Sequence, residues 1–125
     1  MWWHEWQRYA DRHGLTVCRA TLPGAVLGFL AEPGTIVVAD WLPPEPCALV
    51  VWHEIGHLVL HPASCSQWGQ LPTGTQVVWR LERQAWEFAL RYPIWEDDAL
   101  DTALRILRAS GRMPRELRTV LSHLP

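Results

Sequence analysis

Apolar positions recur along this chain with two spacings, and the longer one predicts helices. Trp2, Trp6 and Tyr9 follow one another at helical spacing and would share one face of a first helix. A glycine or proline follows such segments, as Gly14 does here, and marks where a helix ends. The predicted helices cover residues 2–13, 47–61, 78–91, 96–109 and 114–124.

Shorter apolar runs near the N-terminus predict strands. Residues 15–20 form one such run, and residues 25–31 and 35–40 form two more around a Glu-Pro-Gly sequence. Proline and glycine between two apolar runs are typical of a hairpin turn. Residues 63–74 are rich in Gly, Pro, Ser and Thr and predict a loop. The order of elements predicts one α+β domain over residues 1–125, with a short N-terminal sheet.

The predicted helix over residues 47–61 has an unusual composition. A proline-rich stretch, residues 42–46, precedes it, and proline is tolerated in the first turn of a helix. Pro62 ends it. Between these limits the segment is apolar nearly all round apart from its His and Glu residues, which is typical of a buried helix. We therefore expect ionisable side chains inside the core.

Composition and charge place the chain among globular proteins. Of its 125 residues, 49% are hydrophobic and 19% are charged, which suits one modest core. The formal net charge of −2 argues against a protein that binds nucleic acid through a basic surface. No apolar run reaches the length of a membrane span and no signal-peptide pattern is visible, so we expect a cytoplasmic protein without membrane contacts.

The cysteines and tryptophans are expected to serve the core. Cys18, Cys47 and Cys65 form no C-x-x-C pair, and their odd number argues against a disulfide framework. We expect buried, reduced thiols. Nine tryptophans are many for a small domain and are expected to fill its interior.

The candidate chemistry lies in the string HEIGH at residues 53–57. His53 and His57 are four residues apart, so on a helix both imidazoles lie on one face and can hold one metal ion. Zinc accepts imidazole nitrogen and leaves a position open for water, from which Glu54 can take a proton. Gly56 costs a helix about 1 kcal/mol relative to Ala, which indicates close packing there. The alternative is a purely structural histidine pair, although unpaired ionisable groups are costly in an apolar helix.

A third protein ligand must come from elsewhere in the chain. Glu82 lies in the next predicted helix, after a loop long enough to reverse direction, and is the favoured candidate. Glu87 is an alternative, although five residues rotate it about 140° from Glu82. His61 extends the four-residue series but is rotated about 80° from His53 and lies at the helix end. His61 would hold a metal-binding side chain in place, cap the end of the helix, or itself be the third ligand in place of Glu82.

The string HEIGHLVLH at residues 53–61 is followed by ERQAWEFA at residues 82–89. Together they resemble the paired signatures of the ImmA/IrrE-type metallopeptidases, H-E-x-G-H-x-x-x-H and then E-x-x-A-(N/D)-x-F-A. Pro93 matches the end of the second signature. Residues 22–37 resemble the hairpin before the active helix, and residues 107–121 are similar to the closing helix pair. The resemblance covers most of the chain, and its specific part is the two helical motifs.

The resemblance implies a small zincin-like domain in which His53, His57 and Glu82 bind zinc and Glu54 is the base. It implies cleavage of a protein, often a helix-turn-helix repressor, in stress response or in the control of mobile elements. Trp86 departs from the pattern, because the family usually has Asn or Asp there. Either another group supplies the polar contact that supports the site, or zinc affinity and activity are reduced.

Peptide hydrolysis also needs a place for the substrate and a group that stabilises the oxyanion. An extended substrate would pair with a sheet edge, for which residues 35–40 are the candidate strand. Tyr92, Arg80 and His123 are candidates for the oxyanion, and the sequence does not choose among them.

Two functions of other classes are compatible with the sequence. A non-catalytic anti-repressor would have the same fold and bind a repressor without cleaving it. Trp86 favours this function, because it stands where the metallopeptidases usually have Asn or Asp. A DNA-binding protein would use the last two helices, where Arg112, Arg115 and Arg118 could touch phosphate. We expect a solvated helix face there instead, and no direct contact with nucleic acid, because the chain is acidic overall.

Overall fold

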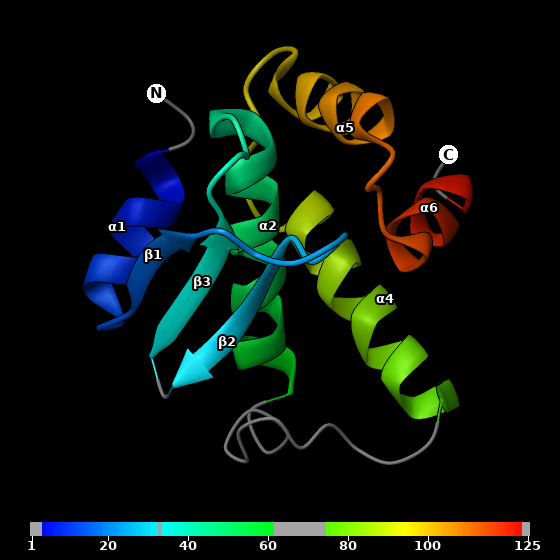
Figure 1. The fold of residues 1–125 in the computed structure, drawn as a ribbon. Helices are drawn as coiled ribbons and strands as arrows, with labels where there is room; N and C mark the ends of the chain where they lie inside the picture. Colours follow the sequence, from blue (N-terminus) through cyan, green and yellow to red (C-terminus); the bar gives the residue numbers. More distant parts are fainter. Residues whose placement is uncertain (1–3, 33, 62–74, 124–125) are drawn as a thin grey trace.

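One small sheet and five helices make up the described part of the chain. A computed structural model describes residues 4–32, 34–61 and 75–123. In chain order the elements are α1 (His4–Arg12), β1 (Thr16–Ala20), β2 (Gly28–Glu32), β3 (Thr35–Ala39), α2 (Pro44–Leu60), α4 (Thr75–Arg91), α5 (Ala99–Ser110) and α6 (Arg115–Ser122) (Figure 1). The α+β class is confirmed for these residues, and the loop predicted over residues 63–74 lies outside them. No described helix has both the length and the apolar content that a membrane span needs.

Local backbone constraints set the ends of the helices. α2 begins at Pro44, earlier than predicted, because proline is tolerated at the first position of a helix. α5 begins at Ala99, later than predicted, because Asp97 has a φ of 41°, which a helix does not permit. Gly111 ends α5 in the left-handed conformation with a φ of 72°, as expected for a glycine that follows a helix.

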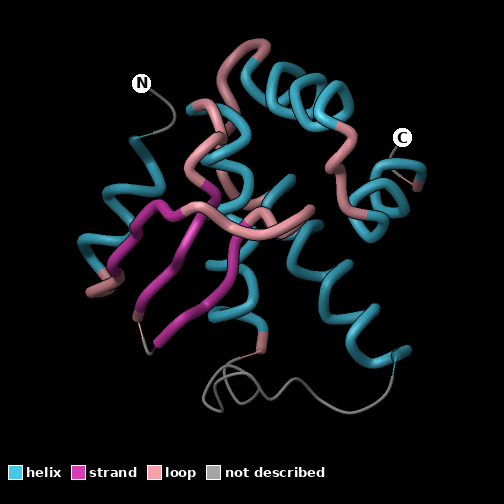
Figure 2. The backbone as a smooth tube through the Cα atoms, viewed as in Figure 1, coloured by secondary structure: helices cyan, strands magenta, loops and turns pink. Residues whose placement is uncertain are grey.

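The three strands form one sheet in the order β1-β3-β2 (Figure 2). The predicted hairpin is confirmed, since β2 pairs antiparallel with β3 and Gly34 in the turn has a φ of 80°. β1 pairs parallel with β3 on its other side. The prediction that residues 35–40 form a sheet edge is therefore wrong. A strand whose residues Ile36–Ala39 are all apolar and buried is typical of the centre of a sheet.

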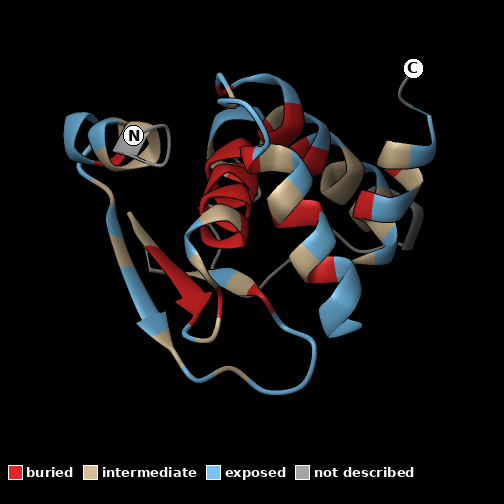
Figure 3. Cartoon of the chain, turned by 90° about the horizontal axis from the view of Figure 1, so that it is seen from above, coloured by how far each residue is buried: buried red, intermediate tan, exposed pale blue. Residues whose placement is uncertain are grey.

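Helix α2 lies against the sheet and forms the centre of the core (Figure 3). It contacts β2 and β3 of the sheet and the helices α1, α4 and α5. Its residues 46–57 are buried, as their uniformly apolar pattern predicts. Three ionisable side chains lie among them, those of His53, Glu54 and His57. The core of this protein therefore contains a polar cluster on its central helix.

Two glycines let neighbouring elements approach α2 closely. A Cβ atom on Gly28 of β2 would lie 2.9 Å from the carbonyl oxygen of Val37 and 2.9 Å from Cγ1 of Val50 on α2. A Cβ atom on Gly56 of α2 would lie 3.1 Å from the carbonyl oxygen of Ala85 on α4. The expectation of close packing at Gly56 is confirmed, and the partners on α4 are the carbonyl group of Ala85 and the side chain of Phe88.

The expectations for cysteine and tryptophan hold only in part. Cys47 is buried, but Cys18 is exposed because it lies on the edge strand β1. Cys65 lies outside the described residues. Trp52 and Trp86 are buried in the core, with 3% and 2% of their surface exposed. Partly buried tryptophans pack against the same core: Trp6, Trp41 and Trp95.

Candidate metal centre

The side chains of His53, His57 and Glu82 meet where α2 packs against α4. The two histidines lie four residues apart on α2, so their rings project from one face. Their Nε2 atoms lie 2.9 Å and 3.0 Å from the two carboxylate oxygens of Glu82. The close approach of the helices at Gly56 and Ala85 brings this carboxylate within reach. The structure thus brings together the three side chains that the sequence favours as ligands.

The donor atoms of this cluster are close enough together to hold one metal ion. One donor atom from each of the three side chains lies within 4.8 Å of the others, and both histidines are buried. Two ligands of tetrahedral zinc, each about 2.0–2.1 Å from the ion, lie roughly 3.3 Å apart. The observed N···O separations of 2.9 Å and 3.0 Å are slightly shorter, as expected where hydrogen bonds join the same atoms. Two imidazole nitrogens and one carboxylate are a ligand set of catalytic zinc sites.

Glu54 contacts the opposite side of the His53 ring. Nδ1 of His53 donates a hydrogen bond of 2.9 Å to Oε2 of Glu54, and both side chains are buried. A carboxylate in this position holds a ligating imidazole in one orientation and raises its basicity. In this rotamer Glu54 orients His53 and does not border its Nε2 atom. This contact could not be predicted from the sequence, because it depends on the side-chain conformations of two adjacent residues.

Charges within the cluster shift two pKa values in opposite directions. Burial alone lowers the pKa of His53, but the carboxylates of Glu54 and Glu82 outweigh burial and raise it to about 9. Burial alone raises the pKa of Glu82, but its hydrogen bonds and charge interactions with His53 and His57 hold it well below the usual range. In the metal-free protein at neutral pH, a protonated His53 is therefore paired with an ionised Glu82.

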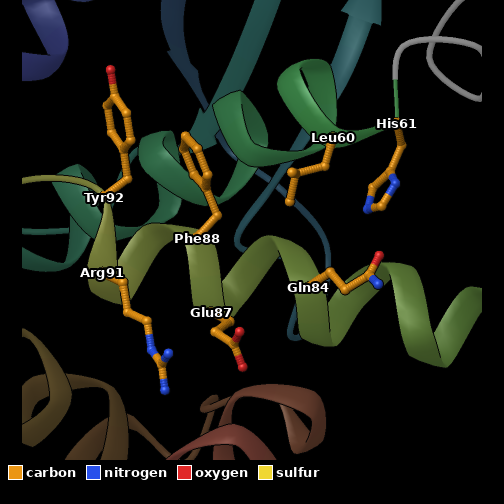
Figure 4. A pocket seen from close by; sticks show the side chains of 7 residues that line it. All are labelled: Leu60, His61, Gln84, Glu87, Phe88, Arg91 and Tyr92. Atoms are coloured by element: carbon orange, nitrogen blue, oxygen red, sulfur yellow. The ribbon is translucent and has the colours of Figure 1, made fainter.

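The two alternative ligands lie outside the donor cluster. The ring of His61 is centred 5.7 Å from that of His57. The pKa of His61 is lowered, mainly by burial and to a smaller extent by the nearby His57. Glu87 is exposed and points away from α2, whereas Phe88 beside it points toward α2 (Figure 4). The rotation of about 140° between Glu82 and Glu87 along a helix explains why only Glu82 reaches the histidines.

A surface hollow of about 610 Å³ lies along α4 beside the end of α2 (Figure 4). Its lining residues are Leu60, His61, Gln84, Glu87, Phe88, Arg91 and Tyr92. None of the three candidate ligands lines it. His61 lines the hollow, and its ring also neighbours that of His57. The hollow is therefore adjacent to the candidate metal centre but distinct from it.

Trp86 covers the face of the His53 ring. The two rings are stacked, with their centres 3.8 Å apart and an angle of 17° between their planes. Trp86 follows Glu82 by one helical turn, so both side chains lie on the same face of α4. The four-residue spacing of Glu82 and Trp86 is therefore the feature of the sequence that could have indicated the stacking on His53. The family resemblance indicates only that Trp86 stands where a polar Asn or Asp is usual.

The three candidates for oxyanion stabilisation are all exposed. Tyr92 is 56% exposed and its ring neighbours those of Trp52 and Phe88. Arg80 and His123 are exposed as well. The geometry therefore selects none of the three.

Two arginines near the C-terminus lie over tryptophan rings. The guanidinium carbon of Arg112 is 5.2 Å from the ring centre of Trp41, and that of Arg115 is 5.1 Å from the ring centre of Trp79. Cation–π contacts of this kind stabilise packing at a protein surface. Two of the three arginines that could touch phosphate therefore have partners within the protein itself.

Comparison with known proteins adds no family assignment. No family model, no curated protein and no solved structure matches this chain. The class that the fold and the site define is an α+β protein in which two buried histidines and a partly buried glutamate form a cluster that could hold a metal ion.

Replacing Glu82 tests whether the cluster binds metal. Glu82→Ala removes the oxygen donors, and we expect the Kd for zinc to rise about 100-fold or more, since changes beyond the ligands already cost about 10–100-fold. Glu87→Ala is the matched control, because Glu87 is exposed on the same helix. The Kd of this variant for zinc is expected to equal that of the wild type. Competition with a chromophoric chelator measures both. Equal affinities in the two variants would contradict the assignment of Glu82.

Zinc binding at neutral pH is expected to release a proton from His53. The ion needs a neutral imidazole, and with a pKa of about 9 His53 is protonated in the metal-free protein. The affinity should therefore increase by about tenfold per pH unit above pH 7 and level off above about pH 9. Titration calorimetry in buffers of different ionisation enthalpy measures the released proton. A binding enthalpy that is identical in all buffers is the opposing result.

Proposed function

We propose that this protein is a zinc-dependent peptidase that cleaves a protein substrate, with His53, His57 and Glu82 as metal ligands and Glu54 as the general base. The proposal is carried by one observation, the meeting of two buried imidazole nitrogens with both oxygens of a single carboxylate. When bound, zinc supplies Lewis acidity for the scissile carbonyl and the attacking water. The resemblance to the ImmA/IrrE-type signatures supports the same roles and suggests a helix-turn-helix repressor as substrate.

Glu54 has two roles in this proposal. In the described rotamer its carboxylate holds the Nδ1 side of His53. To act as the base, Glu54 would have to release His53 and turn its carboxylate toward the ligand cluster by rotation about its side-chain bonds. There, Oε2 can accept a proton from the attacking water and return it to the leaving amine.

The edge strand β2 is the proposed docking place for an extended substrate. β1, the other edge of the sheet, contacts α1, whereas β2 contacts α2. Gly28 of β2 lies against Val50, which precedes Glu54 by about one helical turn. Backbone groups on the outer side of β2 can pair with a peptide and hold its scissile bond beside the cluster. β2 therefore takes the role that the sequence suggested for residues 35–40.

The second candidate is a non-catalytic protein that binds a repressor without cleaving it. The hydrogen bond between His53 and Glu54 favours this candidate, because it engages the carboxylate that hydrolysis needs. Metal would then have a structural role, as a link between α2 and α4.

Glu54→Gln separates the two candidates. The substitution preserves the shape of the side chain and removes its basic carboxylate, so we expect cleavage of a peptide library to slow by about 10²–10⁴-fold. The zinc content, measured by plasma mass spectrometry on protein purified without added metal, should stay near that of the wild type. Glu87→Gln makes the same chemical change at an exposed position and should leave the cleavage rate unchanged.

Two results would contradict the proposed peptidase. Wild-type protein that takes up no zinc would remove the metal centre. The second result is that the zinc-loaded protein abolishes DNA binding by a repressor without cleaving it. If the Glu54→Gln variant does so as well as the wild type, the non-catalytic candidate is established.

A further inference from the structure

Trp86 is buried against a ligand of the proposed metal centre. Only 2% of its surface is exposed, and its indole stacks on the imidazole of His53 with ring centres 3.8 Å apart. The ring planes differ by only 17°, so the contact is face to face. Because Trp86 lies one turn after Glu82, one face of α4 presents both the carboxylate donor and the stacked ring.

We propose that Trp86 is a positioning residue that holds His53 in the orientation needed for metal binding, a role that rests on the proposed metal site. Two contacts restrain the imidazole. The hydrogen bond from Nδ1 to Glu54 fixes which edge of the ring faces Glu82. The indole blocks rotation of the ring out of its plane, because such a rotation would drive the imidazole into Trp86.

The stack also suits an imidazole that binds metal. The face of an indole ring is electron-rich and attracts an electron-poor partner. An imidazole that donates an electron pair to a metal ion is such a partner. A ring that is already held in this orientation loses little conformational freedom on binding.

The ring face of Trp86, and not its N–H group, makes this contact. Among the described residues, Nε1 of Trp86 is buried and has no hydrogen-bond partner. Phenylalanine can thus supply a stacked face at this position without the loss of a hydrogen bond. Leucine fills much of the space but has no aromatic face. The two substitutions separate stacking from simple packing.

Zinc affinity tests this role. We expect the Kd to rise about tenfold or more in Trp86→Leu, as is typical when a group that orients a ligand is removed. In Trp86→Phe it should stay within about threefold of the wild type, because the aromatic face remains. Trp52→Leu is the matched control. Trp52 is 3% exposed and neighbours the rings of Phe88 and Tyr92, so its loss should lower stability without changing the Kd.

The absorption spectrum of the cobalt-loaded protein reports ligand geometry and should change in Trp86→Leu but not in Trp52→Leu. If both variants have the same Kd and the same cobalt spectrum, the positioning role is overturned and the metal centre stands. If the wild-type protein binds neither zinc nor cobalt, the metal centre is overturned, and the role of Trp86 with it.

Nuclear magnetic resonance on the zinc-loaded wild type covers the case in which Trp86→Leu does not fold. A stacked indole shields the ring protons of His53 and moves their resonances upfield of those of His57. Trp86→Phe should reduce this shift, because a smaller ring gives a weaker ring current. His53 resonances that coincide with those of His57 would overturn the proposal.

Discussion

The contact between α2 and α4 is the constraint on which the candidate site depends. With glycine at position 56, the carbonyl oxygen of Ala85 comes within 3.1 Å of the place where a Cβ atom would stand. This closeness puts the carboxylate of Glu82 against two imidazoles that belong to another helix. Interiors are close-packed, so a larger side chain at this contact would push the helices apart and separate the donor atoms. The strands β2 and β3 also pack against α2.

A buried cluster of charges is a costly feature of a small domain, and here each charge has a partner. Desolvation opposes the charged forms of His53 and Glu82. The carboxylates of Glu54 and Glu82 nevertheless raise the pKa of His53, and the imidazoles of His53 and His57 lower that of Glu82, so each group is moved toward its charged form. The cluster therefore holds a proton in the place where a cation would bind. In the proposed metal centre, exchange of that proton for a metal ion would link occupancy of the site to pH, with the ring of His53 held against Trp86.

Much of this site could be predicted from the sequence because helical periodicity is a local property. The four-residue spacing of His53 and His57 fixes their common face, and the apolar residues around Glu82 indicate which side of α4 packs inward. The strand order could not be predicted, since the parallel pairing of β1 with β3 joins distant segments and leaves no local mark. Side-chain conformations are likewise products of tertiary packing. The contact of Glu54 with Nδ1 of His53 is the main example.

The central claim is that two imidazoles and one carboxylate hold a single ion, and X-ray absorption at the zinc K edge of the zinc-loaded protein tests it most directly. We predict only nitrogen and oxygen neighbours at about 2.0–2.1 Å, with the multiple scattering of two imidazoles. A sulfur neighbour at about 2.3 Å, contributed by Cys18 or Cys47, or a spectrum with fewer than two imidazoles, would contradict it.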